Sequence, residues 1–265
     1  MTLISLSALD LSVAALLVVL LGVLSWRLHL GIGRELGVAA ARTVVQLLLV
    51  GLALTAIFEH AHFGWVSLIA LVMLLAAGRE AMTRQERRFI GWWGFGLGAL
   101  SMFVSSFTLT IYALLAVIGP EPWYAPQYAI PLLGMVLGNT LTGIALALDR
   151  LTQNAWDRRH VIEQRLMLGA SAAEAIVDIR RLAMRSGMMP SVNAMAVAGI
   201  VSLPGMMTGQ ILAGAPPLEA VKYQILIMFL ITAGTGFGTF AAIWLGAQRL
   251  FDGRDRLRLE RLQQR

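Results

Sequence analysis

Long apolar stretches separated by short polar segments dominate the chain. Seven of them approach the roughly 20 mostly apolar residues that a helix needs to cross a bilayer. They cover approximately residues 6–26, 36–58, 63–78, 90–118, 128–148, 190–213 and 222–248. The first contains Asp10 and has no basic residue before it, so we interpret it as a membrane helix and not as a cleaved signal peptide. The pattern predicts an all-α integral membrane protein with about seven transmembrane helices, forming a single domain over residues 1–265.

The basic residues are concentrated in alternate connections. All but Arg42 and Lys222 of the 21 lysines and arginines follow the first, third or fifth stretch or lie in the tail, residues 249–265. Because cytoplasmic loops carry an excess of such residues, we expect the N-terminus outside and the C-terminus in the cytoplasm. We interpret the tail as a basic amphipathic segment. The net charge of +6 then reflects topology and contact with anionic lipid, and gives a nucleic-acid role little support.

Composition agrees with a membrane protein and excludes several chemistries. Hydrophobic residues make up 58 % of the chain, charged residues 14 %, and the mean hydropathy is +0.74. Cysteine is absent, which removes disulfides, thiolate metal sites and cysteine nucleophiles. The only lysine, Lys222, has no glycine-rich run before it, so the chain has no phosphate-binding loop and we expect it to bind no cofactor. Nor does it contain a hydrolase motif, so we do not expect an enzyme.

The connection over residues 150–189 is the only long one. Apolar residues at helical spacing end at Gly169, a typical helix stop. Ser171, followed three residues later by Glu174, forms a capping-box pattern that starts a second helix. The segment is therefore predicted to be a helix, a tight turn and another helix.

This segment resembles the E-A-A-x-x-x-G loop of ABC-transporter permeases, in which a short cytoplasmic helix docks into a groove on the ATPase. The matching run is Glu163-Gln-Arg-Leu-Met-Leu-Gly169-Ala-Ser171, with Gln164 and Arg165 where the loop has alanines. The resemblance implies that the coupling residues are Glu163, Leu168, Gly169, Ala170 and Ser171. An amphipathic helix lying on the membrane surface is the alternative interpretation.

Over residues 35–250 the chain is similar to the FetB/YbbM family of ABC permeases, which is assigned to iron export and has plant relatives in aluminium tolerance. The similarity rests on the runs Arg42-Thr-Val-Val-Gln46-Leu, Ile130-Pro-Leu-Leu-Gly134-Met135, Leu168-Gly-Ala-Ser171, Val201-Ser-Leu-Pro204-Gly-Met-Met207-Thr-Gly209 and Ala220-Val-Lys222-Tyr-Gln224. It implies a permease subunit in the bacterial inner membrane that exports iron with a separate ATPase, on which ATP and Mg²⁺ bind. Since 265 residues supply about half of a translocation path, we expect a homodimer.

Other functions stay open at this stage. The same machine would also suit another cargo, such as a different metal or a nucleotide sugar. A carrier or channel without an ATPase usually places carboxylates inside the membrane, and here only Asp10, near the end of a stretch, is such a residue. A membrane enzyme would need a catalytic set that the sequence does not contain.

Polar residues inside the stretches are candidates for a translocation path or gate. Arg42 and Gln46 share one face of their predicted helix. Arg42 either extends to the interface or pairs with a carboxylate at an inner gate. Asn139 lies among Gly134, Gly138 and Gly143, where we expect close helix packing and an interhelical hydrogen bond.

The sixth stretch, residues 190–213, is the expected gate. Pro204 should kink the helix, and Gly205 and Gly209 leave room for a neighbouring helix to slide. The thioether and amide groups of Met135, Met206, Met207 and Gln210 are suitable for contact with a passing cation, although membrane methionines more often serve in packing.

A second candidate lies between the second and third stretches. Glu59, His60 and His62 form a cluster of residue types that bind divalent transition metals. Solvated side chains in a short loop are the alternative, so the sequence leaves any metal site undefined.

Overall fold

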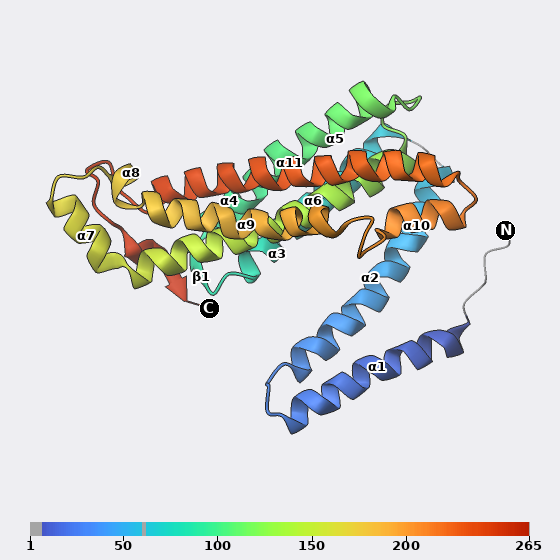
Figure 1. Cartoon of the computed structure of the whole chain (residues 1–265), viewed down its shortest axis with the longest axis horizontal. Helices are drawn as coiled ribbons and strands as arrows, with labels where there is room; N and C mark the ends of the chain where they lie inside the picture. Colours follow the sequence, from blue (N-terminus) through green and yellow to red (C-terminus); the bar gives the residue numbers. More distant parts are fainter. Residues whose placement is uncertain (1–6, 60–61, 265) are drawn as a thin grey trace. The chain divides into compact units, whose positions relative to one another are not determined.

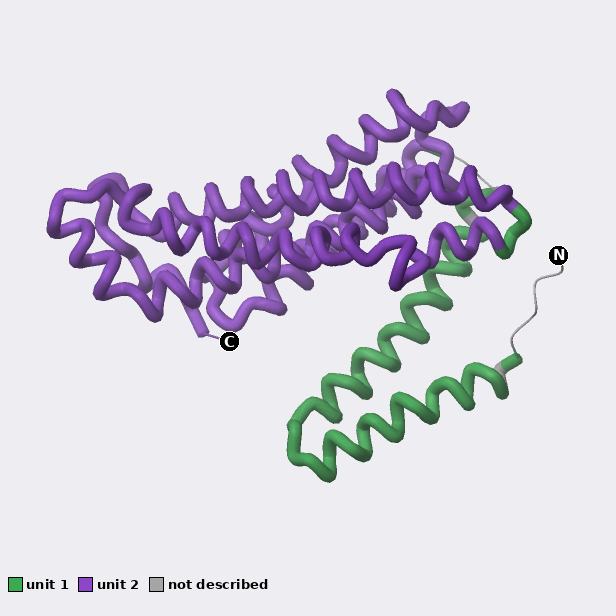
Figure 2. The backbone as a smooth tube through the Cα atoms, in the orientation of Figure 1, with its two compact units in different colours: residues 1–62, 212–214 green, residues 63–211, 215–265 purple. Residues whose placement is uncertain are grey.

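The computed structural model describes residues 7–59 and 62–264, except for the side chains of Ala8, Ala56 and Glu59. The chain forms two compact units, coloured separately in Figure 2. Unit 1 comprises residues 1–62 and 212–214, and unit 2 comprises residues 63–211 and 215–265.

Unit 1 contains a helical hairpin of α1 (Ala8–Arg27) and α2 (Gly33–Glu59) (Figure 1). The Oγ of Ser7 accepts a hydrogen bond from the backbone N–H of Asp10, while the Asp10 carboxylate accepts one from the backbone N–H of Ser7 at 2.8 Å, which starts α1. Most apolar side chains of both helices are exposed. Such surfaces are typical of helices that face lipid or another protein.

Unit 2 is a helical bundle with one small sheet. Its elements are α3 (Phe63–Thr83), β1 (Arg87–Phe89), α4 (Trp92–Met102), the π-helix η1 (Phe103–Phe107), α5 (Thr108–Tyr112), the π-helix η2 (Ala113–Ile118), α6 (Pro126–Asp157), α7 (Arg159–Met167), α8 (Ala172–Ala175), α9 (Val177–Val197), α10 (Gly205–Leu212), α11 (Pro217–Arg249), the 3₁₀-helix η3 (Leu259–Arg261) and β2 (Leu262–Gln264). The last residue of α10, Leu212, falls in unit 1.

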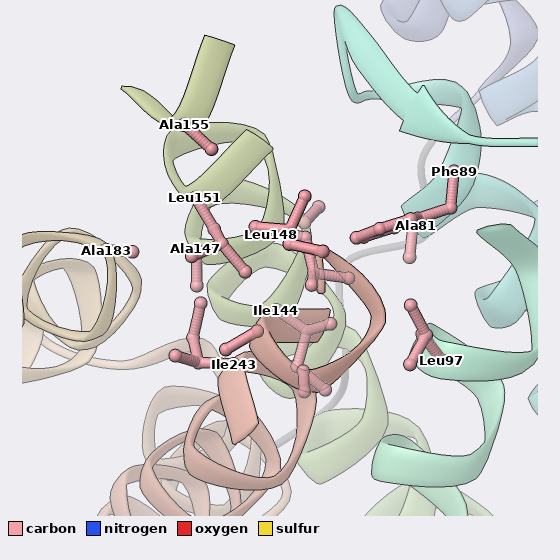
Figure 3. Packing of buried hydrophobic residues seen from close by; sticks show 14 of the residues in the cluster. Ala81, Phe89, Leu97, Ile144, Ala147, Leu148, Leu151, Ala155, Ala183 and Ile243 are labelled. Atoms are coloured by element: carbon pink, nitrogen blue, oxygen red, sulfur yellow. The ribbon is translucent and has the colours of Figure 1, made fainter. Parts of the chain in front are cut away.

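Helix α6 is the centre of unit 2 and packs against α3, α9 and α11. Its apolar residues recur every three or four positions, which places Ile144, Leu148 and Leu151 on one fully buried face (Figure 3). Ile243 of α11 belongs to the same cluster of buried side chains. Moving a large aliphatic side chain from water into a protein core stabilises the fold by about 1.5–3 kcal/mol. Lipid is itself apolar, so moving the same side chain from lipid into the core contributes less, and close packing between the helices must supply more of the stability.

Glycines allow the closest contacts of this bundle. A Cβ atom added at Gly143 in α6 would collide with Cγ2 of Thr235 and would lie 2.8 Å from the carbonyl oxygen of Gly187 in α9. A Cβ at Gly187 would lie 2.6 Å from the carbonyl oxygen of Gly143. The two backbones therefore touch at this point, as small residues permit between membrane helices.

The C-terminal tail folds back onto the bundle. Strand β2 pairs antiparallel with β1, with Arg87 opposite Gln264 and Phe89 opposite Leu262. Thr152 of α6 donates a hydrogen bond to the carbonyl oxygen of Arg87 at 2.7 Å. The end of unit 2 that contains β1, β2, α7, α8 and the C-terminus of α6 is called the basic end below. Tail residues 262–264 thus form a strand of unit 2.

Asp252 shapes the turn after α11. Its carboxylate accepts hydrogen bonds from the backbone N–H groups of Arg254 and Arg256 and ion pairs with Arg256 and Arg258 at 2.9 Å. These hydrogen bonds hold the pKa of Asp252 well below its usual range. The tail is thereby directed back towards β1.

Six helices of the described residues are long and apolar enough to cross a membrane, which confirms the all-α membrane class. They are Leu9–Arg27, Gly33–Thr55, Phe63–Thr83, Trp92–Ile118, Pro126–Asp157 and Pro217–Arg249. The predicted stretch 190–213 is not among them, so the expectation of one continuous helix there is wrong.

The stretch 190–213 is divided because its middle cannot stay helical. Helix α9 ends at Val197, Gly199 adopts a left-handed φ of +83°, and α10 begins only at Gly205. Pro204 has no N–H to donate and disfavours helical geometry in the residue before it. Pro204 therefore ends a break of seven residues, 198–204, where we expected a kink.

Candidate functional site

A cavity of about 270 Å³ lies between α6, α10 and α11 in unit 2. Its lining residues on α6 and α11 come from the first third of each helix, at the end of unit 2 opposite the basic end. Six of the lining side chains carry polar or sulfur atoms: Gln127, Tyr128, Met135, Met206, Gln210 and Tyr223. The cavity therefore brings together three residues predicted for the path, Met135, Met206 and Gln210.

Helical spacing explains why these side chains converge. Gln127, Pro131 and Met135 are four residues apart on α6, and Met206 and Gln210 are four apart on α10. Residues at this spacing share one face of a helix. The sequence prediction missed Gln127, Tyr128 and Tyr223, although the spacing of Gln127 from Met135 was a signal that could have been used.

Gln210 has the only buried side-chain polar atom in the described lining that lacks a hydrogen-bond partner. Its Oε1 atom is buried and accepts no hydrogen bond from the described residues. A buried acceptor without a partner costs about 1–3 kcal/mol. Gln210 thus lines the cavity while its unpartnered oxygen is covered by neighbouring atoms, and rotation of the side-chain amide would be needed to expose that acceptor to the cavity.

The other path candidates in unit 2 lie outside the cavity lining. Asn139 is exposed, and its Nδ2 donates to the carbonyl oxygen of Met135 in its own helix at 2.8 Å, so its predicted interhelical bond stays a prediction. Met207 is buried, with 8 % of its surface exposed. A Cβ added at Gly138 or Gly209 would meet no atom within 4 Å. The close approach predicted around Asn139 occurs at Gly143, but not at Gly138.

Arg42 and Gln46 lie on α2 of unit 1, four residues apart and exposed. Their assignment to a gate stays a prediction. His60 and the side chain of Glu59 lie outside the described residues, so the metal cluster with His62 also stays a prediction. Within the described part of the chain, no three histidine or acidic residues are grouped as a metal site requires.

The predicted coupling segment forms a protruding turn at the basic end. Helix α7 ends at Met167, and Gly169 adopts a φ of +91°. The N–H of Gly169 donates to the carbonyl oxygen of Leu166, and that of Ala170 to Arg165, which is a Schellman motif. Leu168 at the tip of the turn is 88 % exposed. The Gly169 helix stop is therefore confirmed.

Arg165, where the resembled loop has alanine, fixes this turn to the bundle. Its Nη2 pairs with the Asp178 carboxylate at 2.9 Å and its Nη1 donates to the carbonyl oxygen of Ala175 at 3.2 Å. Arg165 thus joins α7 to α8 and to the start of α9. Glu163 of the predicted coupling set is exposed and lies 3.9 Å from Nδ1 of His160.

The capping box at Ser171 is confirmed. The Glu174 carboxylate accepts hydrogen bonds from the hydroxyl and the backbone N–H of Ser171 at 2.7 and 2.9 Å, and these bonds lower the pKa of Glu174. The helix that starts here is interrupted once, at Ile176, which separates α8 from α9.

Replacing Ser171 by alanine should destabilise this helix start by about 1 kcal/mol, because the cap to the backbone N–H of Glu174 is lost. Hydrogen exchange over residues 172–183 is expected to become faster, while exchange in α3 stays the same. Because its hydrogen bonds with Ser171 lower the pKa of Glu174 in the folded protein, the ionised carboxylate stabilises the fold at neutral pH. This stabilisation is lost as the pH falls through the lowered pKa. Equal exchange over residues 172–183 in both proteins would show that the cap is dispensable.

Comparison with known proteins gives consistent matches over most of the chain. The family described as Uncharacterised protein family (UPF0014) matches residues 8–251. The UPF0014 membrane protein slr1647 of Synechocystis is 41 % identical over 83 % of this chain and 84 % of its own length. The probable iron export permease protein FetB of Escherichia coli is 28 % identical over 97 % and 96 %. The protein ALUMINUM SENSITIVE 3 of Arabidopsis thaliana is 32 % identical over 88 % and 83 %. No solved structure is significantly similar.

Proposed function

Because the chain belongs to the UPF0014 family of multi-pass membrane proteins, we propose that it is the permease subunit of an ABC transporter that exports iron. The name of the Escherichia coli relative, a probable iron export permease, supports both the permease role and the cargo. The single structural observation that carries the proposal is the protruding turn around Leu168.

An exposed turn of this kind suits docking to an ATPase. Leu168 is 88 % and Met167 79 % exposed, next to the left-handed Gly169, while Arg165 links the turn to α9 through its ion pair with Asp178. Apolar side chains on a fixed, exposed turn gain free energy when they enter a groove of a partner. The ATP and Mg²⁺ needed for transport would bind to that partner, since this chain has no phosphate-binding loop.

A movement of the turn can reach the cavity along the chain itself. Helix α9 begins just after the turn, and the break at 198–204 connects it to α10, which supplies Met206 and Gln210 to the cavity. A displacement of α9 would be passed to α10 through a non-helical segment that can change its φ and ψ angles. We propose that ATP-driven closure of the ATPase moves α10 in this way.

The exposed face of α6 supports a second copy of the chain in the assembly. Asn139 and Thr142 are exposed there, next to Met135 of the cavity. Polar side chains at membrane depth are expensive towards lipid and usually face protein or a water-filled path. A homodimer would enclose this face and complete the path.

The experiment uses the tagged chain together with its candidate ATPase in inside-out proteoliposomes. We expect the ATPase to copurify, and ferrous iron to accumulate inside the vesicles only when MgATP is added outside. The chain alone should neither hydrolyse ATP nor accumulate iron. Iron accumulation without ATPase and MgATP would instead identify a carrier, and ATP-driven uptake of a different solute would correct the cargo.

A further inference from the structure

We propose that the cavity between α6, α10 and α11 is a binding site for a soft, singly charged metal cation, held by the thioethers of Met135 and Met206 and the carbonyl oxygen of Gln210. The inference goes beyond the proposed function, because binding at this site requires neither an ATPase nor iron as the cargo.

The identity of the donor atoms selects the class of metal. Met135 and Met206 belong to different helices and line the same cavity, so two flexible thioether side chains border one space. Thioethers are soft ligands that favour Cu(I) over hard ions, which prefer carboxylate and water oxygens. Gln210 lines the same cavity, and its oxygen, which has no other partner among the described residues and is covered in this structure, would supply a third donor after rotation of the side-chain amide. Two sulfur atoms and one oxygen are a suitable ligand set for a three-coordinate soft ion.

Electrostatics selects the charge of the ion. The described lining of the cavity contains no Asp, Glu or His side chain, so no negative charge in it would balance a cation. Removing an ion from water into a low-dielectric site is costly, and by the Born relation this cost grows with the square of the charge. A divalent ion would therefore lose about four times as much hydration free energy as a monovalent one, with neutral ligands alone to replace it.

The neutral ligand set also favours release. A cation held by thioethers and an amide forms no ion pair with the protein, so its departure does not leave an uncompensated buried charge. Tyr128 and Tyr223 also line the cavity, and the lone pairs of their hydroxyl oxygens can coordinate the ion as it leaves. The site thus combines selectivity for soft ions with moderate affinity.

The test uses Ag(I), a soft monovalent ion that does not undergo redox chemistry in ordinary buffers, and the purified full-length chain in lipid nanodiscs. Equilibrium dialysis in chloride-free buffer, followed by metal analysis, gives the stoichiometry and affinity. We expect Met135→Leu/Met206→Leu to lose one Ag(I) per chain, with affinity at the site reduced more than about 100-fold, since loss of outer-sphere partners alone costs 10–100-fold. Gln210→Leu should weaken binding less.

Matched controls separate this site from other methionines. Met73→Leu/Met184→Leu removes two thioethers outside the cavity lining and should bind Ag(I) as the unmodified chain does. Gel filtration and thermal unfolding verify that each variant is folded, and single Met135→Leu and Met206→Leu variants replace the double variant if it is not. Equal Ag(I) binding by the cavity and control variants would overturn the proposal. Equally tight binding of Mn²⁺ that depends on Met135 and Met206 would overturn the assigned class of ion.

Discussion

Gly143→Ala is expected to destabilise unit 2 by about 3 kcal/mol or more, a large loss for the addition of one methyl group. The new Cβ would collide with Thr235 of α11 and would lie 2.8 Å from the carbonyl oxygen of Gly187 in α9. Neither the backbone of α9 nor the short side chain of Thr235 can move away cheaply. Thermal unfolding of the purified protein, followed by tryptophan fluorescence, should show a lower midpoint and less folded protein after extraction.

Gly138→Ala is the matched control in the same helix. A Cβ at this position meets no atom within 4 Å, and glycine inside a helix costs about 0.5–1 kcal/mol relative to alanine. The control variant should therefore be equally stable or slightly more stable. If both variants unfold at the same midpoint, the backbone contact between α6 and α9 does not contribute to stability.

Leu168→Asp is expected to abolish stimulation of the ATPase while leaving the chain folded. The side chain is 88 % exposed and does not pack in the isolated chain, so stability should change by less than about 0.5 kcal/mol. A charge placed in a desolvated docking groove should cost at least about 2 kcal/mol of binding, or roughly a 30-fold weaker complex. Copurification and MgATP hydrolysis in proteoliposomes measure the loss.

Leu168→Met provides the control, because it keeps an apolar side chain of similar volume on the same turn. This variant should retain nearly full hydrolysis and copurification. Normal hydrolysis by the Leu168→Asp protein would show that the turn is not the docking element. Loss of hydrolysis in both variants would indicate that only the shape of leucine fits the groove.

Local features of the structure were predictable because a few neighbouring residues determine them. Ser171 with Glu174 starts a helix, and Gly169 ends one, through hydrogen bonds within three to five residues. The membrane helices follow from apolar stretches in the same way. Break 198–204 was missed because its residues are apolar, with Ile200, Val201 and Leu203 resembling a membrane helix by hydropathy. Gly199 and Pro204 were the signals against continuity.

Features that depend on how helices rotate against each other were not predictable. Gly138 and Gly143 look equivalent in the sequence, yet only Gly143 contacts another backbone. Met206 and Met207 are adjacent, yet only Met206 lines the cavity. Which of two such residues faces a neighbour depends on how the helix is rotated about its own axis in the bundle. The sequence therefore indicated Met135 and Met206 as candidate donors without showing that they line one cavity.

The pairing of β1 with β2 constrains the order in which the protein is assembled. Residues 87–89 are made before α4, α6 and α11, but their partners, 262–264, are made after these helices. The membrane helices can insert during synthesis, whereas the strand between α3 and α4 must wait for residues 262–264 to pair. A product that stops before residue 262 would leave the edge of β1 unpaired. Proteases that remove incomplete membrane proteins would thus have a recognisable mark of truncation.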